Sequence, residues 1–237
     1  MERVLILGAS GQIGTELVNT LRAAHGNDQV IAADLRAAGL SEPCACMDAT
    51  DEHALRELVT KEGVTVVYQL VAMLSATGEK MPEKAWALNM QALFAVLNLA
   101  KDQLIKQVFW PSSIAAFGPN TPALGSPQTT VMDPTTVYGI SKLSGELWCQ
   151  YYHDKYGVDV RSIRYPGLIS WGAEPGGGTT DYAIDIFHAA KKDNAYTCFL
   201  AEDTRLPMMH MDDAIRATLE LMNAPKEQLS IWTSYNV

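Results

Sequence analysis

Short apolar runs and segments of helical periodicity alternate along this chain. Val4 to Leu7 is an unbroken apolar run, too short for a helix, and predicts a strand buried on both faces of a parallel sheet. The same pattern predicts further strands at 29–33, 64–70, 107–110 and 158–163, and helices at 12–24, 54–62 and 81–101. A further helix, which Thr135 or Thr136 can cap, is predicted to carry Tyr138 and Lys142 and to continue through 141–156. Strands that alternate with helices indicate an α/β fold built on a doubly wound parallel sheet.

A glycine-rich turn joins the first predicted strand to the first predicted helix. Gly8, Gly11 and Gly14 permit a tight bend, close approach of a ligand to the backbone, and close packing of helix on strand. The free N–H groups at the start of that helix, at Gln12 and Ile13, favour a pyrophosphate. A flexible turn without a ligand is the alternative, but the order of elements is that of a Rossmann-type dinucleotide site.

Asp34 ends the second predicted strand, twenty residues after Gly14. Its carboxylate can accept hydrogen bonds from two ribose hydroxyls and would repel a 2′-phosphate, which favours NAD over NADP. Arg36 works against this preference, because an arginine can neutralise a 2′-phosphate. Asp48 could meet the adenine edge, although an acidic loop residue is as often simply solvated.

The composition is that of a globular protein with an acidic balance. Of 237 residues, 48% are apolar and 19% charged, and 27 acidic side chains outnumber 18 basic ones, for a net charge of -9. This balance argues against non-specific binding to nucleic acid or to an anionic membrane. Because the four cysteines and five histidines lack disulfide-framework or metal-ligand spacing, and no leader or membrane span is evident, we expect a cytoplasmic protein without a metal site.

A second group of residues suits acid–base chemistry. Tyr138 and Lys142 are four residues apart on one face of a predicted helix, and Ser113 follows the fourth predicted strand. The ammonium, together with the positive ring of an oxidised nicotinamide cofactor, is expected to lower the tyrosine pKa from about 10, so that a phenolate can deprotonate an alcohol. Ser113 would hold the same oxygen, with Ser112 as the competing assignment. Asn89, set among apolar residues, must find partners, and bracing the next loop is one way to do so.

These motifs are similar to those of the short-chain dehydrogenases/reductases. The run G-A-S-G-Q-I-G resembles their extended branch, which includes sugar-nucleotide epimerases and dehydratases, and the resemblance covers nearly the whole chain. It implies a catalytic triad of Ser113, Tyr138 and Lys142, supported by Asn89, with Lys142 also bridging the ribose hydroxyls. Alone, Y-x-x-x-K would be as typical of an ordinary amphipathic helix.

Two later stretches narrow the resemblance. G-A-E-P-G-G-G-T-T-D-Y-A-I-D-I-F-H-A-A and Y-T-C-F-L-A-E-D-T-R-L-P-M-M-H-M-D-D-A-I-R-A-T closely resemble the L-threonine 3-dehydrogenases of this fold. The resemblance implies a step of threonine catabolism, in which NAD oxidises the β-hydroxyl of L-threonine to give 2-amino-3-oxobutyrate. The expected substrate contacts are Ser75, Ser113, Tyr138, Thr179 and Thr180. Three consecutive glycines directly before Thr179 offer a hinge for closure.

The remaining cofactor contacts are expected where predicted strands run out into loops. The full set of expected cofactor contacts is Gly8, Gly11, Gln12, Ile13, Gly14, Asp34, Leu35, Arg36, Asp48, Leu70, Ala72, Asn89, Tyr138, Lys142, Tyr165, Pro166 and Leu168.

We divide the chain into an NAD-binding Rossmann domain, 1–170, and a small substrate lobe, 171–237, of which about 205–223 returns to the first domain. Family members continue past the last residue of this sequence, so the lobe is expected to be shortened at its C-terminus. Because the helix at 141–156 has more apolar surface than the sheet needs, and family members commonly pair through such helices, a homodimer is expected.

Two other functions stay open. A sugar-nucleotide epimerase would use the same Ser-Tyr-Lys set, but the presumed lobe offers only Lys191 and Lys192 to a diphosphate, so a small amino acid fits better. A non-catalytic NAD-binding protein would be indicated by a broken triad, and the three triad residues are all present.

Overall fold

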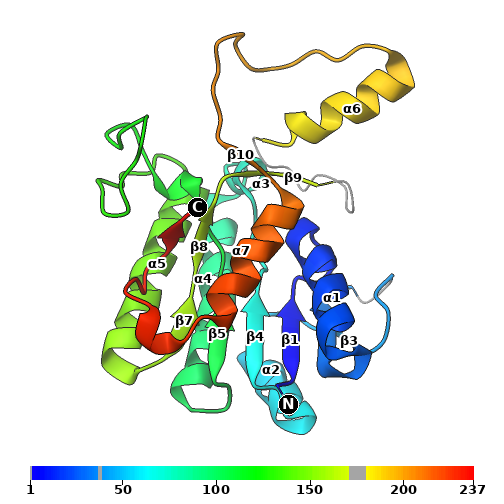
Figure 1. Ribbon diagram of the computed structural model, residues 1–237, viewed down its shortest axis with the longest axis vertical. Coiled ribbons are helices and arrows are strands. Elements are labelled where there is room, and N and C mark those ends of the chain that lie inside the picture. The colour runs from blue at the N-terminus through cyan, green and yellow to red at the C-terminus, as the bar shows by residue number, and fades with distance from the viewer. Residues whose placement is uncertain (1, 37–38, 171–179) are drawn as a thin grey trace.

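The computed structural model of the chain describes residues 2–36, 39–170 and 180–237. At its centre lies a parallel sheet of six strands in the order β3-β2-β1-β4-β5-β7 (Figure 1). These strands are β1 (Val4–Leu7), β2 (Val30–Asp34), β3 (Cys44–Cys46), β4 (Val66–Gln69), β5 (Gln107–Phe109) and β7 (Asp159–Arg161). The strand order reverses between β1 and β4, which places a crevice at the carboxyl ends of these two strands.

Strand β1 explains why its sequence is apolar without interruption. Leu5 and Leu7 enter one hydrophobic core, whereas Val4 and Ile6 enter the other, on the opposite face of the sheet. All four side chains are at most 4% exposed. Since successive strand residues point to opposite faces, only a strand covered on both sides carries such a run.

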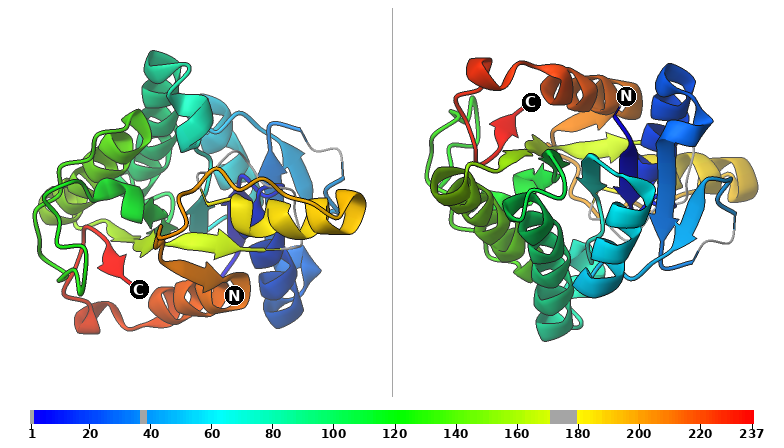
Figure 2. Two further views of the ribbon diagram at one scale, coloured as in Figure 1. Left: turned by 90° about the horizontal axis from the view of Figure 1, so that it is seen from above. Right: turned by 90° about the horizontal axis from the view of Figure 1, so that it is seen from below.

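Helices cover both faces of the sheet (Figure 2). On one face lie α1 (Gln12–His25) and α7 (Met211–Asn223); on the other lie α2 (Glu52–Glu62), α4 (Pro82–Lys101) and α5 (Val137–Tyr156). The short α3 (Ser75–Gly78) follows β4, and α6 (Tyr182–Asp193) stands apart, beyond the carboxyl ends of the central strands (Figure 1). Single 3-10 turns occupy Asn27–Gln29, Ile114–Ala116 and Lys226–Gln228.

The ends of α5 are set by local sequence. Thr136 accepts a hydrogen bond from the Gly139 backbone N–H at 3.0 Å, which satisfies one of the free donors of the first turn. At the other end Gly157 takes a left-handed conformation with φ of 71°, which favours glycine. These two signals hold twenty residues in one helix that carries Tyr138 and Lys142.

Two smaller sheets extend the structure toward the C-terminus. β9 (Gly167–Ile169) pairs with β10 (Met208–His210), and β8 (Ile163–Tyr165) pairs with both β6 (Ser112–Ser113) and β11 (Tyr235–Asn236). After β10 the chain enters α7, which packs beside α1 against the main sheet.

The predicted α/β fold with a Rossmann-type parallel sheet is confirmed. Two details differ. The edge strand β3 was not predicted, because C-A-C is short and partly exposed. The single strand expected at 158–163 is divided between β7 and β8, which belong to different sheets. The division at residue 170 stays a prediction. In the described part of the chain, no helix combines the length and apolar character needed to cross a membrane.

Candidate active site

The glycine turn after β1 is as tight as its sequence suggests. Gly8 has φ of 84°, and its N–H, like that of Ala9, donates to the Ala33 carbonyl of β2, at 2.9 and 3.1 Å. A Cβ placed on Gly14 would lie 2.2 Å from the Gly8 carbonyl oxygen. The start of α1 therefore lies directly against the turn, with its first N–H groups at the carboxyl end of β1.

The polar groups around this turn fit a dinucleotide. Asp34 Oδ2 accepts hydrogen bonds from the Ser10 backbone N–H at 3.1 Å and the Ser10 hydroxyl at 2.6 Å, so the carboxylate is fixed beside the turn. The side-chain nitrogen of Gln12 is buried and has no hydrogen-bond partner among the described residues. A buried donor without an acceptor is costly, and a pyrophosphate or ribose would supply acceptors.

Ser113, Tyr138 and Lys142 come together where β6 meets α5. The Lys142 ammonium donates to the Pro111 carbonyl at 2.5 Å and lies 5.4 Å from the centroid of the Tyr138 ring. The same ammonium is 4.6 Å from the centroid of the Trp110 ring. The Ser113 hydroxyl lies near enough to the Tyr138 hydroxyl to act on its pKa in the lowering direction. The competing assignment, Ser112, turns away into the interior and donates to Glu146.

Two glycines of α5 make this approach possible. A Cβ on Gly139 would lie 2.1 Å from the Ala115 carbonyl oxygen, and one on Gly145 would lie 2.4 Å from the Trp110 ring. No larger residue fits at either position without moving backbone or a buried ring. The helix consequently packs directly on the segment that carries Ser113.

Burial opposes both charges of the predicted pair. Desolvation raises the pKa of Tyr138 to about 12, although the hydrogen bond with Ser113 acts in the lowering direction. Desolvation lowers the pKa of Lys142 to about 7, against the opposing influence of Cys149 and Glu146. The expected lowering of the Tyr138 pKa by Lys142 is therefore absent in the chain by itself, because loss of water outweighs a neighbour whose own charge is disfavoured.

Asn89 braces the neighbouring loop, as its buried position predicted. Its side-chain oxygen accepts from the Met73 backbone N–H at 2.7 Å, and its nitrogen donates to the Ser141 hydroxyl at 3.0 Å. Ser141 in turn donates to the Tyr138 carbonyl at 2.7 Å. The loop after β4 is thus tied to the first turns of α5.

The other predicted contacts lie at the same edge of the sheet or close to it. Leu70 and Ala72 follow β4, and Ser75 begins α3. Pro166 lies between β8 and β9, and Leu168 lies within β9. Thr180 packs on Gly167, where an added Cβ would meet its methyl carbon at 2.7 Å. Thr179 lies outside the described residues. All these residues stay predictions as ligand contacts.

Two predicted contacts, Tyr165 and Asp48, have environments that limit their roles. Tyr165 is 4% exposed and its hydroxyl is bonded to Thr218, so any contact with a cofactor would have to come from its backbone. Asp48 accepts from the backbone N–H and hydroxyl of Thr50, which holds its pKa below the usual range in a local turn. Leu35 and Arg36 are exposed just after β2.

Sequence reasoning missed residues that act through these groups. Ser10, inside the glycine turn, was not connected with Asp34, and Ser141 was not connected with Asn89. A polar residue within a tight turn was a usable signal for Ser10, whereas Ser141 and Asn89 lie on different helices and no local pattern connects them. The described residues contain no group of three histidine, cysteine or acidic side chains that could hold a metal ion.

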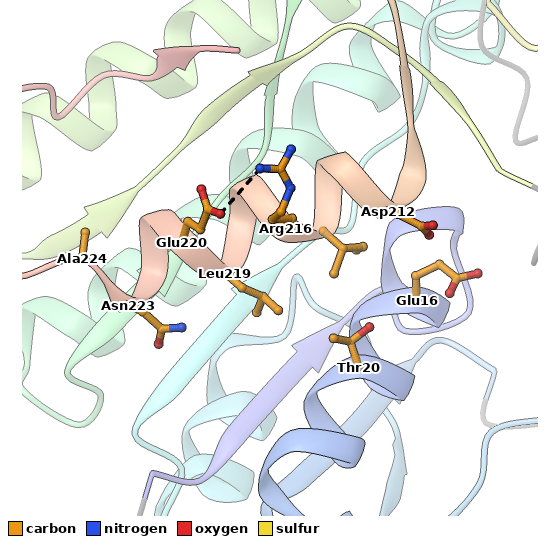
Figure 3. A pocket seen from close by; sticks show the side chains of 9 residues that line it. Glu16, Thr20, Asp212, Arg216, Leu219, Glu220, Asn223 and Ala224 are labelled. Carbon is orange, nitrogen blue, oxygen red and sulfur yellow. Dashed lines mark ion pairs between the residues drawn. The ribbon is translucent and has the colours of Figure 1, made fainter.

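A groove of about 690 Å³ lies elsewhere, between α1 and α7 (Figure 3). Glu16 and Thr20 face Asp212 and Arg216 across it, and Arg216 Nη1 is 3.7 Å from Glu220 Oε1. None of the predicted site residues lines this groove, so it does not belong to the site at the strand ends.

Comparisons with known proteins agree with this geometry. A family model described as the NAD dependent epimerase/dehydratase family matches residues 4–237. Among solved structures, a partial consensus L-threonine 3-dehydrogenase is 58% identical with a TM-score of 0.97, and the match covers 99% of this chain and 76% of that chain. The holo form of an L-threonine dehydrogenase from Cupriavidus necator is 57% identical with a TM-score of 0.96, covering 99% and 77%.

Other relatives share the fold but have names other than L-threonine dehydrogenase. An uncharacterised epimerase/dehydratase of Staphylococcus saprophyticus is 47% identical over an alignment of 242 residues. The alignment covers 100% of this chain and 75% of that protein. A UDP-glucose 4-epimerase from Thermotoga maritima is 20% identical with a TM-score of 0.85, a likeness that shows the fold alone.

The expected membership of the extended short-chain dehydrogenases/reductases, and with it an NAD-dependent oxidoreductase, is confirmed at the level of the family. The match runs through the glycine turn, the triad and both small sheets without interruption. The chain belongs to the NAD dependent epimerase/dehydratase family.

Proposed function

We propose that this protein oxidises the β-hydroxyl of L-threonine to 2-amino-3-oxobutyrate. The observation that supports this most is the convergence of Ser113, Tyr138 and Lys142 at the carboxyl ends of the strands, next to a glycine turn with an unpartnered Gln12 amide among the described residues. Bound NAD supplies the acceptor of the hydride that leaves the carbon bearing the hydroxyl.

The residues of this chain have distinct tasks in that reaction. Tyr138, as phenolate, accepts the hydroxyl proton of the substrate, and Ser113 holds the same oxygen in place. Because burial alone keeps Tyr138 protonated, the phenolate depends on the Ser113 hydrogen bond and on positive charge at the nicotinamide position and at Lys142. Asp34 and Gln12 hold the ribose and pyrophosphate ends of the cofactor.

The small substrate is proposed to bind between α3 and the beginning of α6. Ser75 is half-buried at the first turn of α3, and Thr180 lies two residues before α6, whose N-terminus carries the positive end of a helix dipole that favours a carboxylate. Helices α3 and α6 both lie at the end of the molecule toward which the central strands run (Figure 1).

Absorbance at 340 nm tests this proposal. Purified protein with NAD and L-threonine should form NADH, whereas NAD with UDP-glucose should give neither NADH nor a second UDP-sugar. The epimerase alternative predicts the reverse, and a non-catalytic NAD-binding protein would bind NAD and be silent in both assays. Activity with the UDP-sugar alone would overturn the proposal.

We also propose that the protein forms a homodimer through α4 and α5. Leu147, Trp148 and Tyr151 of α5 are 58%, 39% and 41% exposed, and the Trp148 ring packs edge-on against Phe94 of α4 with centroids 4.9 Å apart. Such an apolar surface over two adjacent helices suits a self-complementary interface. Light scattering should give twice the monomer mass, reduced to the monomer by Leu147→Asp.

Leu124→Asp is the matched control for the dimer, because Leu124 is 86% exposed in the loop before α5, outside the apolar surface formed by α4 and α5, and its replacement should leave the dimer intact. A monomeric wild-type protein would contradict this assembly.

A cytoplasmic location fits the four cysteines, all of which are free thiols.

A further inference from the structure

A buried ionic cluster lies directly behind the triad. Glu146 is fully buried; its Oε1 accepts from the Ser112 hydroxyl at 2.5 Å and from Arg164 Nε at 2.8 Å. Its Oε2 accepts from Arg164 Nη2 at 2.6 Å. A fully buried carboxylate needs partners of this quality, and here a bidentate arginine and a hydroxyl supply them.

The cluster continues a stripe along α5 that begins with the triad. Tyr138, Lys142 and Glu146 follow one another at intervals of four residues, and so lie on one face of the helix. Lys142 donates to the Pro111 carbonyl, Glu146 accepts from the Ser112 hydroxyl, and Ser113 lies beside Tyr138. Three consecutive residues, Pro111 to Ser113, therefore face three successive turns of one helix.

Strand geometry connects Ser112 to the position of Ser113. The two are adjacent residues of β6, so their side chains point to opposite sides, and fixing one hydroxyl inward fixes the other outward. In the pairing of β6 with β8, Ser112 lies opposite Arg164, and both residues bind the same Glu146 carboxylate. The carboxylate consequently joins both strands to α5 at the level of the triad.

We propose that Ser112, Glu146 and Arg164 are positioning residues, which hold the Ser113 hydroxyl beside Tyr138, where it can align the substrate oxygen for proton transfer to Tyr138. This inference rests on the proposed function for its kinetic consequence, but its structural content concerns Ser113 alone. Misplacing a group that aligns the reacting oxygen lowers kcat, whereas groups that bind the substrate elsewhere are unaffected.

Arginine 164 extends the same cluster to the end of the chain. Its Nη1 donates to Asn236 Oδ1 at 2.8 Å, and Asn236 in β11 also donates its backbone N–H to Gln128 Oε1 at 2.9 Å. Strand β11 therefore supports the position of Arg164 from the side opposite Glu146.

The test compares two buried serines that differ in their partners. Ser112 and Ser162 are each 3% exposed, and each donates one side-chain hydrogen bond, Ser112 to Glu146 and Ser162 to the Ser234 hydroxyl at 2.9 Å. Ser112→Ala should lower kcat for L-threonine about tenfold while KM changes less than about twofold. Ser162→Ala should leave both constants near those of the wild type, and Ser112→Thr, which restores a hydroxyl, should recover most of the lost kcat.

Amide hydrogen exchange provides a readout that is independent of activity. The Ala115 N–H donates to the Ser113 hydroxyl oxygen at 3.1 Å, so its exchange reports on the position of Ser113. Ser112→Ala should accelerate exchange at Ala115 about tenfold, whereas Ser162→Ala should instead accelerate exchange at Tyr235, whose N–H donates to the Ser162 carbonyl.

Equal exchange at Ala115 in the two variants, or equal kcat, would overturn the positioning role. Failure of the proposed function has a different appearance: the wild-type protein would form no NADH from L-threonine, while the contrast in exchange would persist.

Discussion

The two sides of the site owe their geometry to different interactions. On the cofactor side, β1 is wholly apolar and the turn is shaped by backbone, with Gly14 packed on the Gly8 carbonyl. On the catalytic side, β6 and β8 are fixed by buried polar side chains, above all Glu146 with Arg164. The first arrangement depends on the absence of side-chain volume, and the second on complete hydrogen bonding. Substitutions should therefore do different kinds of damage on the two sides.

The largest effect is expected from breaking the buried ion pair. Glu146→Ala leaves Arg164 charged and without its carboxylate, and should reduce the free energy of unfolding by about 3–5 kcal/mol in urea titrations. Glu62→Ala is the control, because the Arg3–Glu62 pair has a similar 2.7 Å contact but is 34% and 25% exposed. Its loss should be under about 1 kcal/mol. Equal losses of unfolding free energy in the two variants would contradict the claim that a buried ion pair fixes the catalytic side.

The buried Lys142 should make stability on the catalytic side depend on pH. With a folded pKa of about 7 and an unfolded pKa of about 10.5, the folded protein binds fewer protons between these values, so stability rises with pH there. The free energy of unfolding of the wild type, minus that of Lys142→Met, should increase by roughly 3 kcal/mol from pH 7 to 10.

The difference between the two proteins is needed because Cys149 acts in the opposite direction. Burial raises the pKa of its thiol, which makes the folded state lose stability as the unfolded thiol ionises at high pH. Lys142→Met retains Cys149, so subtraction removes this contribution. A flat difference across the range would show that Lys142 retains its ordinary pKa in the folded protein.

On the cofactor side, Gly14→Ala should weaken NAD binding about tenfold to a hundredfold. The added methyl would lie 2.2 Å from the Gly8 carbonyl oxygen, so the turn must shift away from the place where it meets the pyrophosphate. Gly63→Ala is the control, since Gly63 has φ of 64° at the end of α2, with open space around its Cβ. It should reduce stability without changing NAD affinity, as measured by calorimetry.

The smallest effect is expected at Asp34. Asp34→Ala removes a carboxylate that Ser10 holds beside the turn, and should weaken NAD binding about tenfold while leaving NADP binding unchanged or improved. Asp48→Ala should change neither affinity appreciably, because the Asp48 carboxylate is engaged by Thr50. A large loss of NAD binding in Asp48→Ala alone would reassign the adenosine contact.

The sequence predicts the cofactor side better than the catalytic side for a physical reason. Apolar runs and glycines are local signals, so β1, α1 and β2 were found within one or two residues of their bounds. Strands β6, β8 and β11 have two or three residues each, and the buried polar side chains of Ser112 in β6 and Arg164 in β8 are of types usually found at the surface. Their burial depends on partners far away in the sequence.

The electrostatic prediction, which includes the positive ring of a bound cofactor, stays a prediction, and in the chain by itself burial acts against it. Spacing alone places Lys142 beside Tyr138, and it suggests that the ammonium lowers the tyrosine pKa. It does not reveal that both groups are desolvated. Desolvation raises the pKa of Tyr138 and lowers the pKa of Lys142, so the neutral form of each is favoured. The interval of four residues from Lys142 to Glu146 was visible in the sequence, and a third polar position on one helical face was the available signal.

The central claim is that Tyr138 is the base in the oxidation of L-threonine, and Tyr138→Phe tests it most directly. NADH formation should fall by a factor of about 100 to 10,000, while calorimetric NAD binding stays close to that of the wild type. Undiminished NADH formation from L-threonine in Tyr138→Phe would place the base elsewhere and contradict the claim.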